Sequence, residues 1–134
     1  MRFIDTNLFF RYFTRDDEEK AEKVLTLLKR IAKNEEQVIT SSLVMFEVIF
    51  TLESFYKVSR EEIKELLKPI LDLRGLKLQD KDVFREALDI YSQKKKVSFA
   101  DAFHASWAGK KKVKEIYSYD ADFDKLEGIE RIMP

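Results

Sequence analysis

Three amphipathic helical stripes, separated by short apolar segments, constrain the fold more than any other feature of this sequence. Apolar residues in 21–32, 63–71 and 83–91 recur every three or four positions, the period of a helix that buries one face. Between and beyond these stripes lie apolar pieces too short for helices, at 2–4, 38–40, 76–78, 115–118 and 131–133. Short strands that alternate with helices predict an α/β fold with a mostly parallel sheet.

Capping residues predict where these helices begin. Ser59 starts a capping box ahead of the second stripe, and Asp80 precedes the third. Thr14 and Asp17 have the spacing of a cap for the first stripe. Pro69 lies inside the second stripe, so we expect it to kink or shorten that helix.

The composition excludes several kinds of chemistry. The chain has 134 residues, the size of one domain, with 25 basic and 25 acidic residues, so a uniformly basic nucleic-acid-binding surface is excluded. It has no Cys and one His, which excludes disulfides, thiolate catalysis and metal sites built from several histidines. We expect a soluble cytoplasmic protein, because no segment resembles a signal peptide or a membrane span.

Three acidic residues stand where a parallel α/β fold places ligand sites. Asp5 and Asp120 follow predicted strands and Asp101 opens a predicted helix, and such strand ends and helix starts meet at one edge of the sheet. Each residue also has a purely structural interpretation, as a helix cap or a turn residue.

Glu47 is the anomaly among the acidic residues. It interrupts the apolar run 43–50, and no Lys or Arg lies within one helical turn of it. An ionised carboxylate on a buried apolar surface is costly, so a protonated or distantly paired Glu is the structural alternative to a functional one. If all four acids converge, a cation must offset their repulsion. Oxygen ligands without His or Cys favour Mg²⁺ or Mn²⁺.

Taken in order along the chain, these segments resemble the PIN domain. They are Asp5-Thr6-Asn7 after the first strand, Glu47 in an apolar helix, Ser98-Phe99-Ala100-Asp101-Ala102, and Ser118-Tyr119-Asp120 followed by Asp122-Phe123. Within that family the chain looks most like the VapC-type ribonuclease toxins of toxin–antitoxin pairs. The resemblance covers the whole chain and implies one nuclease domain, 1–134. It also implies a three-layer fold, with a twisted, mostly parallel sheet of about five short strands flanked by helices.

The resemblance further implies a metal-dependent endoribonuclease that hydrolyses RNA phosphodiester bonds with one or two Mg²⁺ or Mn²⁺ ions and leaves 5′-phosphate ends. The positions that match the acidic, catalytic and metal-binding quartet are Asp5, Glu47, Asp101 and Asp120. Asp122 is the alternative to Asp120 as fourth ligand. The positions that match supporting residues are Thr6, Asn7 and Ser118.

The expected partners are RNA, a small VapB-like antitoxin and a second copy of the chain in a homodimer. Two lysine clusters flank the Asp101 helix, and they either contact RNA phosphates or form a solvated surface: Lys94, Lys95 and Lys96, and Lys110, Lys111 and Lys112. An aromatic cluster is expected to lie mostly in the core, and its remainder is a candidate groove for the antitoxin: Phe9, Phe10, Phe13, Phe46, Phe50, Phe55 and Tyr56. The alternatives are a housekeeping PIN nuclease that processes RNA and a catalytically silent PIN-like interaction module.

Overall fold

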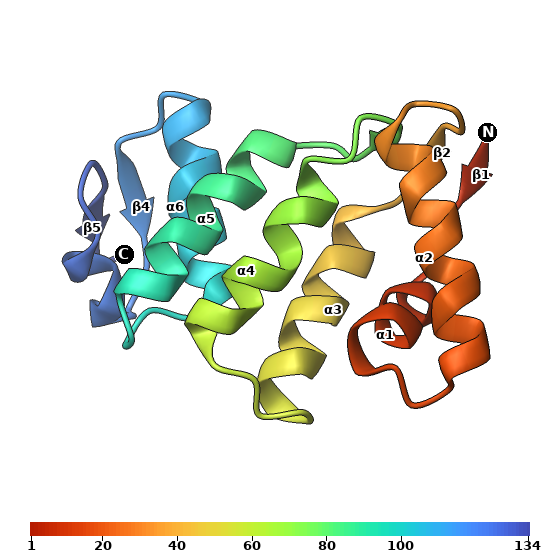
Figure 1. Cartoon of the computed structure of the whole chain (residues 1–134). Coiled ribbons are helices and arrows are strands. Elements are labelled where there is room, and N and C mark those ends of the chain that lie inside the picture. Colours follow the sequence, from red (N-terminus) through yellow and green to blue (C-terminus); the bar gives the residue numbers. More distant parts are fainter. The chain divides into compact units, whose positions relative to one another are not determined.

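The computed structural model describes all 134 residues and confirms the α/β class, with six α-helices and five short strands (Figure 1). Each strand lies within one residue of its expected position. The chain divides into two compact units, Met1–Asp80 and Lys81–Pro134, called unit 1 and unit 2 below and described one at a time. The expectation of a single domain stays a prediction.

Unit 1 is a three-stranded parallel sheet whose strands are connected by pairs of helices. Its elements are β1 (Arg2–Phe3), α1 (Thr6–Thr14), α2 (Glu18–Ala32), β2 (Val38–Ile39), α3 (Ser42–Ser54), α4 (Arg60–Leu71) and β3 (Leu76–Lys77). The strand order is β1-β2-β3, so β2 is central. Arg2 pairs with Val38, and Val38 pairs with Leu76. The buried Thr40 donates a hydrogen bond from its Oγ1 to the Ile4 carbonyl at 2.8 Å, which joins the ends of β1 and β2.

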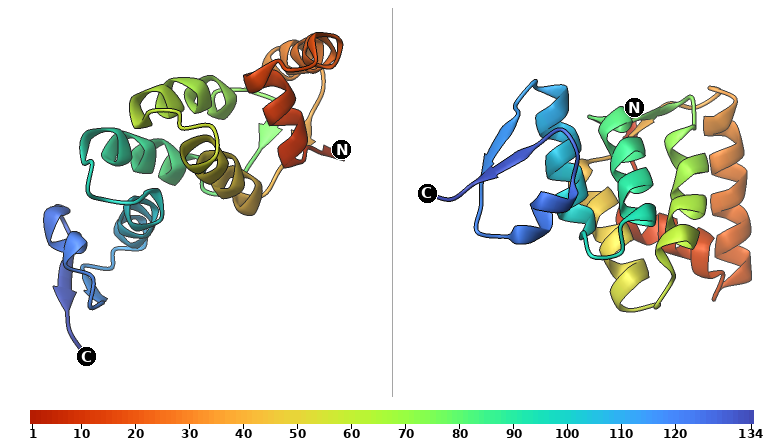
Figure 2. Two further views of the ribbon diagram at one scale, coloured as in Figure 1. Left: turned by 90° about the horizontal axis from the view of Figure 1, so that it is seen from below. Right: turned by 90° about the vertical axis from the view of Figure 1, so that its left-hand side faces the viewer.

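Unit 2 consists of two packed helices and a two-stranded parallel sheet, which the right-hand view of Figure 2 shows clearly. Its elements are α5 (Lys81–Gln93), α6 (Phe99–Lys110), β4 (Glu115–Tyr117), the short 3₁₀ helix η1 (Ala121–Lys125) and β5 (Glu130–Ile132). Aromatic side chains fill the contact between α5 and α6. The ring centroids of Phe84 and Phe103 are 4.8 Å apart, and Tyr91 meets Phe99 edge-on at 5.6 Å.

The expected cap at Ser59 is confirmed, whereas the expectation for Thr14 is wrong. Ser59 precedes α4 and accepts a hydrogen bond from the backbone of Glu62, and Asp17 caps α2 in the same way. Thr14 is instead the last residue of α1, where its hydroxyl donates to the Phe10 carbonyl one turn back at 2.7 Å, and the left-handed Arg15 ends the helix. Helix α4 ends at Leu71, two residues beyond Pro69.

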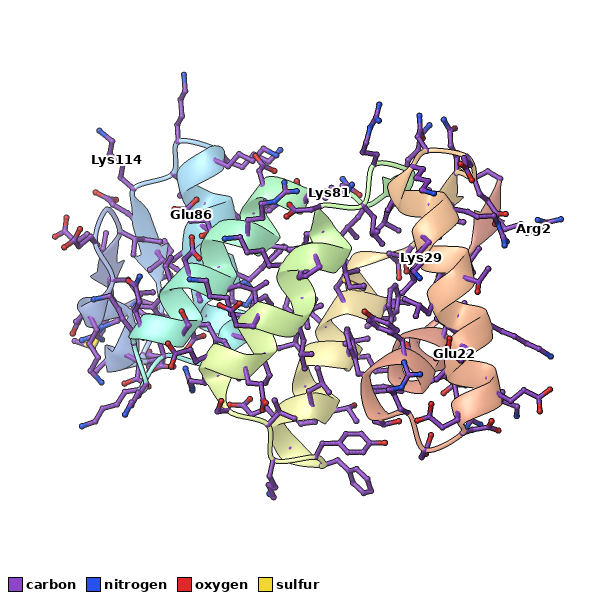
Figure 3. The ribbon with its side chains drawn as sticks, viewed as in Figure 1. Arg2, Glu22, Lys29, Lys81, Glu86 and Lys114 are labelled. Atoms are coloured by element: carbon purple, nitrogen blue, oxygen red, sulfur yellow. The ribbon has the colours of Figure 1, made fainter.

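The outer face of α2 is charged. In α2, the side chains of Glu22 and Lys29 are exposed, whereas Ala21, Val24 and Leu28 are buried (Figure 3). No helix has both the length and the apolar character needed to cross a membrane.

Candidate metal centre

Asp5 joins the first strand to the first helix of unit 1. It lies just beyond β1 and is the N-cap of α1, where its Oδ1 accepts a hydrogen bond from the backbone nitrogen of Leu8 at 3.4 Å. The capping interpretation is therefore confirmed. The carboxylate is also exposed, so capping does not prevent it from binding a ligand.

Glu47 is connected to the start of α1 by a single hydrogen bond. The hydroxyl of Thr6 donates to its Oε2 at 3.2 Å. The expectation that Glu47 lies on a buried apolar surface is wrong, because its side chain is exposed. Helix α3 is apolar on nearly every side, and Leu43 and Phe50, one turn before and after Glu47, are 75% and 67% exposed. Periodicity therefore could not identify the outer face of this helix.

Unit 2 brings three carboxylates together at the start of α6. Oxygen atoms of Asp101, Asp120 and Asp122 all lie within 4.8 Å of one another. This Asp cluster depends on local turns. Ser98 caps α6 and accepts a hydrogen bond from the backbone of Asp101 at 3.1 Å, while the hydroxyl of Ser118 accepts one from the backbone of Asp120 at 2.9 Å.

Burial and like-charge repulsion disfavour the ionised form of Asp101 in this cluster. Partial burial raises the pKa of the Asp101 carboxyl above its usual value, and the charge of Asp120 raises that pKa further. A hydrogen bond from Ser98 opposes the shift. A bound divalent cation would offset this repulsion, and three carboxylates form an oxygen donor set of the kind that Mg²⁺ and Mn²⁺ accept.

Two basic residues near the cluster were not among the site residues expected from the sequence. Lys125 binds Asp122 with its Nζ 2.7 Å from Oδ1, so Asp122 already has a cationic partner. Arg131 binds both carboxylate oxygens of Asp124 at 3.0 Å and also donates to the Ser118 carbonyl at 3.4 Å. Asp122 and Lys125 have the i,i+3 spacing of a local ion pair, whereas nothing in the spacing of Asp124 and Arg131 indicates that they pair.

The Asp124–Arg131 pair leads to a prediction about acid stability. Its hydrogen bonds lower the pKa of Asp124 below the usual value, so the pair is stabilising above the unfolded pKa of about 3.9 and loses this effect as the pH falls through the lower, folded-state pKa. Because the carboxylate is exposed, we expect a small effect. The melting temperature of wild type should fall more steeply below pH 4 than that of Asp124→Asn. Equal slopes in thermal melts across this range would contradict the prediction.

The other expected site residues have separate positions. Asn7 is exposed in the first turn of α1. Lys94–Lys96 are exposed just before α6, on the side where the Asp cluster lies. At the far end of α6, Lys110 binds Asp82 at 3.0 Å, and the Nζ of Lys111 lies 5.3 Å from the centroid of the Trp107 ring.

The structure thus connects Thr6 with Glu47 in unit 1 and gathers Asp101, Asp120 and Asp122 in unit 2. The convergence of both groups on one site stays a prediction.

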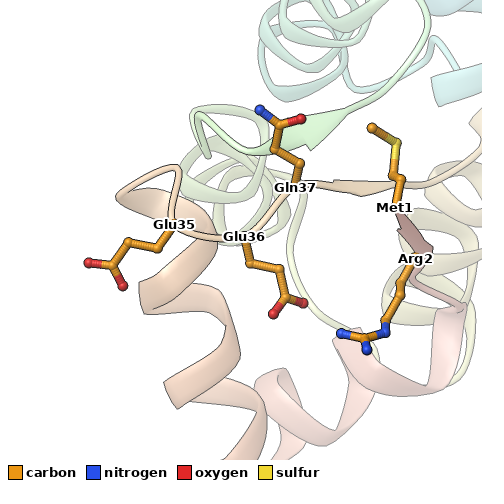
Figure 4. A pocket seen from close by; sticks show the side chains of 5 residues that line it. All are labelled: Met1, Arg2, Glu35, Glu36 and Gln37. Atoms are coloured by element: carbon orange, nitrogen blue, oxygen red, sulfur yellow. The ribbon is translucent and has the colours of Figure 1, made fainter.

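A wide polar hollow in unit 1 belongs to neither group. It has a volume of about 620 Å³ and is lined by Met1, Arg2, Glu35, Glu36 and Gln37 (Figure 4). These residues stand at the amino ends of β1 and β2, whereas ligands of parallel sheets bind beyond the carboxyl ends. Glu36 is also paired with Arg30 at 3.3 Å. We therefore do not assign this hollow to the candidate site.

Comparisons with known proteins identify similar chains. The model of the PIN domain matches residues 2–129. A VapC ribonuclease of Aquifex aeolicus is 29% identical over 134 residues, which span all of this chain and 97% of that protein. Among solved structures, the sarcin–ricin loop cleaving toxin VapC20 of Mycobacterium tuberculosis is 18% identical, with full coverage of both chains and a TM-score of 0.37.

Proposed function

The chain belongs to the PIN domain family, and from this premise we propose that it is a metal-dependent endoribonuclease, the toxin of a toxin–antitoxin pair. The observation that carries the proposal is the Asp cluster, three carboxylates gathered at the start of α6. The full-length similarity to a VapC ribonuclease supports RNA as the substrate.

We propose that Asp101 and Asp120 hold one or two Mg²⁺ or Mn²⁺ ions together with Asp5 and Glu47. Asp120 is favoured over Asp122 as the fourth ligand, because Asp122 is bound to Lys125. Such an ion, when bound, would polarise the scissile phosphate and lower the pKa of an attacking water.

The remaining polar residues of the site would hold these carboxylates in place. Ser98 and Ser118 fix the turns that carry Asp101 and Asp120, and Thr6 orients the carboxylate of Glu47. Rigid support of this kind matters because a displaced ligand weakens both metal binding and catalysis.

A cleavage assay tests this proposal. A mixed pool of single-stranded RNA is incubated with the protein and Mg²⁺ or Mn²⁺, with an EDTA control and analysis of the product ends. We expect cleavage only when metal is present, with 5′-phosphate products. Cleavage that survives EDTA would contradict the metal site. No cleavage of any RNA by the folded, metal-loaded protein would instead favour the silent interaction module.

The exposed apolar side chains of α3 support a protein partner. Leu43, Glu47 and Phe50 lie at intervals of four and three residues, so they share one face of the helix. The two apolar side chains are largely exposed, as expected of a surface that a partner covers. We propose that the antitoxin binds this face, because it would then cover Glu47 and inhibit the nuclease.

The lysine clusters lead to a prediction about RNA binding. Replacing Lys94, Lys95 and Lys96 with Gln should make binding to single-stranded RNA less sensitive to salt. The slope of log K against log salt concentration should become shallower by up to about 2, because each lost phosphate contact reduces the slope by about 0.7. Replacing Lys110–Lys112 should change the slope less, since they stand at the opposite end of α6 from Asp101 and Lys110 is paired with Asp82. Titrations at several salt concentrations measure both slopes. An unchanged slope for Lys94–Lys96 would identify them as a solvated surface.

A further inference from the structure

A small pocket in unit 1, between α1 and the end of α3, shares only Asn7 with the residues expected at the metal centre. It has a volume of about 190 Å³ and is lined by Asn7, Phe10, Arg11, Thr14, Asp16 and Tyr56; we call it the α1–α3 pocket. Cavities that enclose a whole small-molecule ligand usually measure about 300–1,000 Å³. The size of this pocket therefore suits one unit of a longer ligand.

Arg11 supplies the positive charge of the pocket. Its Nη1 lies 3.6 Å from Oδ1 of Asp16, and both side chains are exposed. The hydroxyl oxygen of Thr14 lies 3.2 Å from the same carboxylate oxygen. An ion pair this long and this exposed contributes little, so a phosphate can replace Asp16 as the partner of the guanidinium. Arg11 retains enough donors to bind a phosphate at two points.

Tyr56 supplies an aromatic ring that is already held in place. Its centroid lies 5.8 Å from that of Phe10 and 4.9 Å from that of Phe55, which meets it edge-on. Its backbone nitrogen donates to the Thr51 carbonyl at the end of α3. The side chain is nevertheless 41% exposed. A fixed ring with exposed surface can stack on a base at little entropic cost.

The pocket lies close to the carboxylates of unit 1. Thr6, which binds Glu47, begins α1, and Asn7 is both the next residue and part of the pocket. Arg11 follows Thr6 by five residues, or about 7.5 Å along a helix. That length corresponds to roughly two stacked nucleotides.

We propose that the α1–α3 pocket binds one nucleotide of an unpaired RNA strand, with Tyr56 stacked on the base and Arg11 on a phosphate. The proposal rests on the proposed function and adds to it a nucleotide-binding subsite outside the metal centre. A base inside a duplex is stacked on its neighbours and is not free to stack on Tyr56. The exposed amide of Asn7 offers a donor and an acceptor to the edge of the bound base.

Binding measurements test the pocket without relying on catalysis. In a cleavage-inactive Asp101→Asn background, fluorescence anisotropy follows a labelled single-stranded RNA of mixed sequence and the duplex of the same sequence. Tyr56→Leu should weaken single-strand binding roughly tenfold, whereas Tyr56→Phe, which keeps the ring, should stay within about twofold of the parent. Duplex affinity should change in neither variant.

Arg11→Gln provides an independent test at an exposed position. It should weaken single-strand binding several-fold and reduce the salt slope by about 0.7. The matched control is Arg74→Gln, an exposed arginine in the turn before β3, which should leave both values unchanged. Because Arg11→Gln removes only a long surface ion pair, it keeps the test valid even if Tyr56→Leu fails to fold.

Two results would overturn the proposal. The first is unchanged single-strand affinity in Tyr56→Leu and Arg11→Gln while the wild type cleaves RNA. The second is that these two variants lose affinity for a purified antitoxin but keep their affinity for RNA, which would make the pocket a protein-binding site. Failure of the proposed function is distinct from both, because the wild type would then cleave no RNA under any metal condition.

Discussion

Replacing Asp101 with Asn is expected to abolish RNA cleavage and, at the same time, to raise the melting temperature of the metal-free protein. The loss of activity follows from the position of Asp101 in the Asp cluster, where its carboxylate would be a ligand of the catalytic ion. We expect a decrease of more than about a hundredfold, since even residues that only support a metal ligand contribute 10- to 100-fold.

The gain in stability follows from the electrostatics of the cluster. Burial and the charge of Asp120 raise the folded-state pKa of Asp101, so the folded protein binds the proton more tightly than the unfolded chain does. The stability of wild type should therefore decrease as the pH rises from about 3.9 through this raised pKa. Asn has no charge to ionise, so the variant lacks this decrease and should melt higher at neutral pH.

Thermal melts with and without Mn²⁺, run beside the cleavage assay, measure both effects. Mn²⁺ should raise the melting temperature of wild type by mass action and should have little effect on Asp101→Asn. Asp124→Asn is a suitable control because it lies in the same segment but is bound to Arg131. It should keep cleavage and should melt slightly lower than wild type. Full activity in Asp101→Asn would remove this residue from the proposed metal site.

The largest effect on stability is expected from Gly75→Ala. A Cβ atom at this position would overlap the backbone carbonyl oxygen of Glu36 and would stand 2.9 Å from that of Ile31. The backbone of Gly75 also donates to Ile31 and accepts from Val38, at 2.9 and 2.8 Å, so the strand cannot move away without losing these hydrogen bonds. We expect a loss of about 2–4 kcal/mol in the free energy of unfolding, or roughly 10 °C in melting temperature.

Gly109→Ala is the matched control for this substitution. Gly109 lies in α6, and a Cβ atom there meets nothing within 4 Å. Alanine should therefore stabilise this protein by about 0.5–1 kcal/mol through its higher helix propensity. Urea denaturation of both variants measures the two changes. If Gly75→Ala were as stable as wild type, the close packing between β3 and the turn after α2 would be contradicted.

Features that depend on a few neighbouring residues could be predicted well from the sequence. The five strands were expected from short apolar pieces, and the cap at Ser59 was expected from a side chain that can reach a backbone nitrogen three residues on. The turns that carry Asp101 and Asp120 belong to the same class of feature. Ser98 and Ser118 position Asp101 and Asp120 through hydrogen bonds with residues two or three positions away.

Features that depend on which surfaces meet could not be predicted in this way. Glu47 was expected among buried apolar groups and is exposed. This exposure could not be predicted, because a helix that is apolar on nearly every side has no sequence pattern to mark its outer face. A local rule failed separately at Thr14, which had the spacing of a cap for α2 but is the last residue of α1.

By itself, the sequence determined the α/β class and the positions of the strands, since both follow from local periodicity. Only the tertiary structure decided that Arg131 binds Asp124 and that Tyr56 packs against Phe10 in the α1–α3 pocket. The second of these pairings joins residues 46 positions apart in the sequence, and the first depends on how η1 folds against β5. Such contacts follow from the packing of whole elements, which no short stretch of sequence specifies.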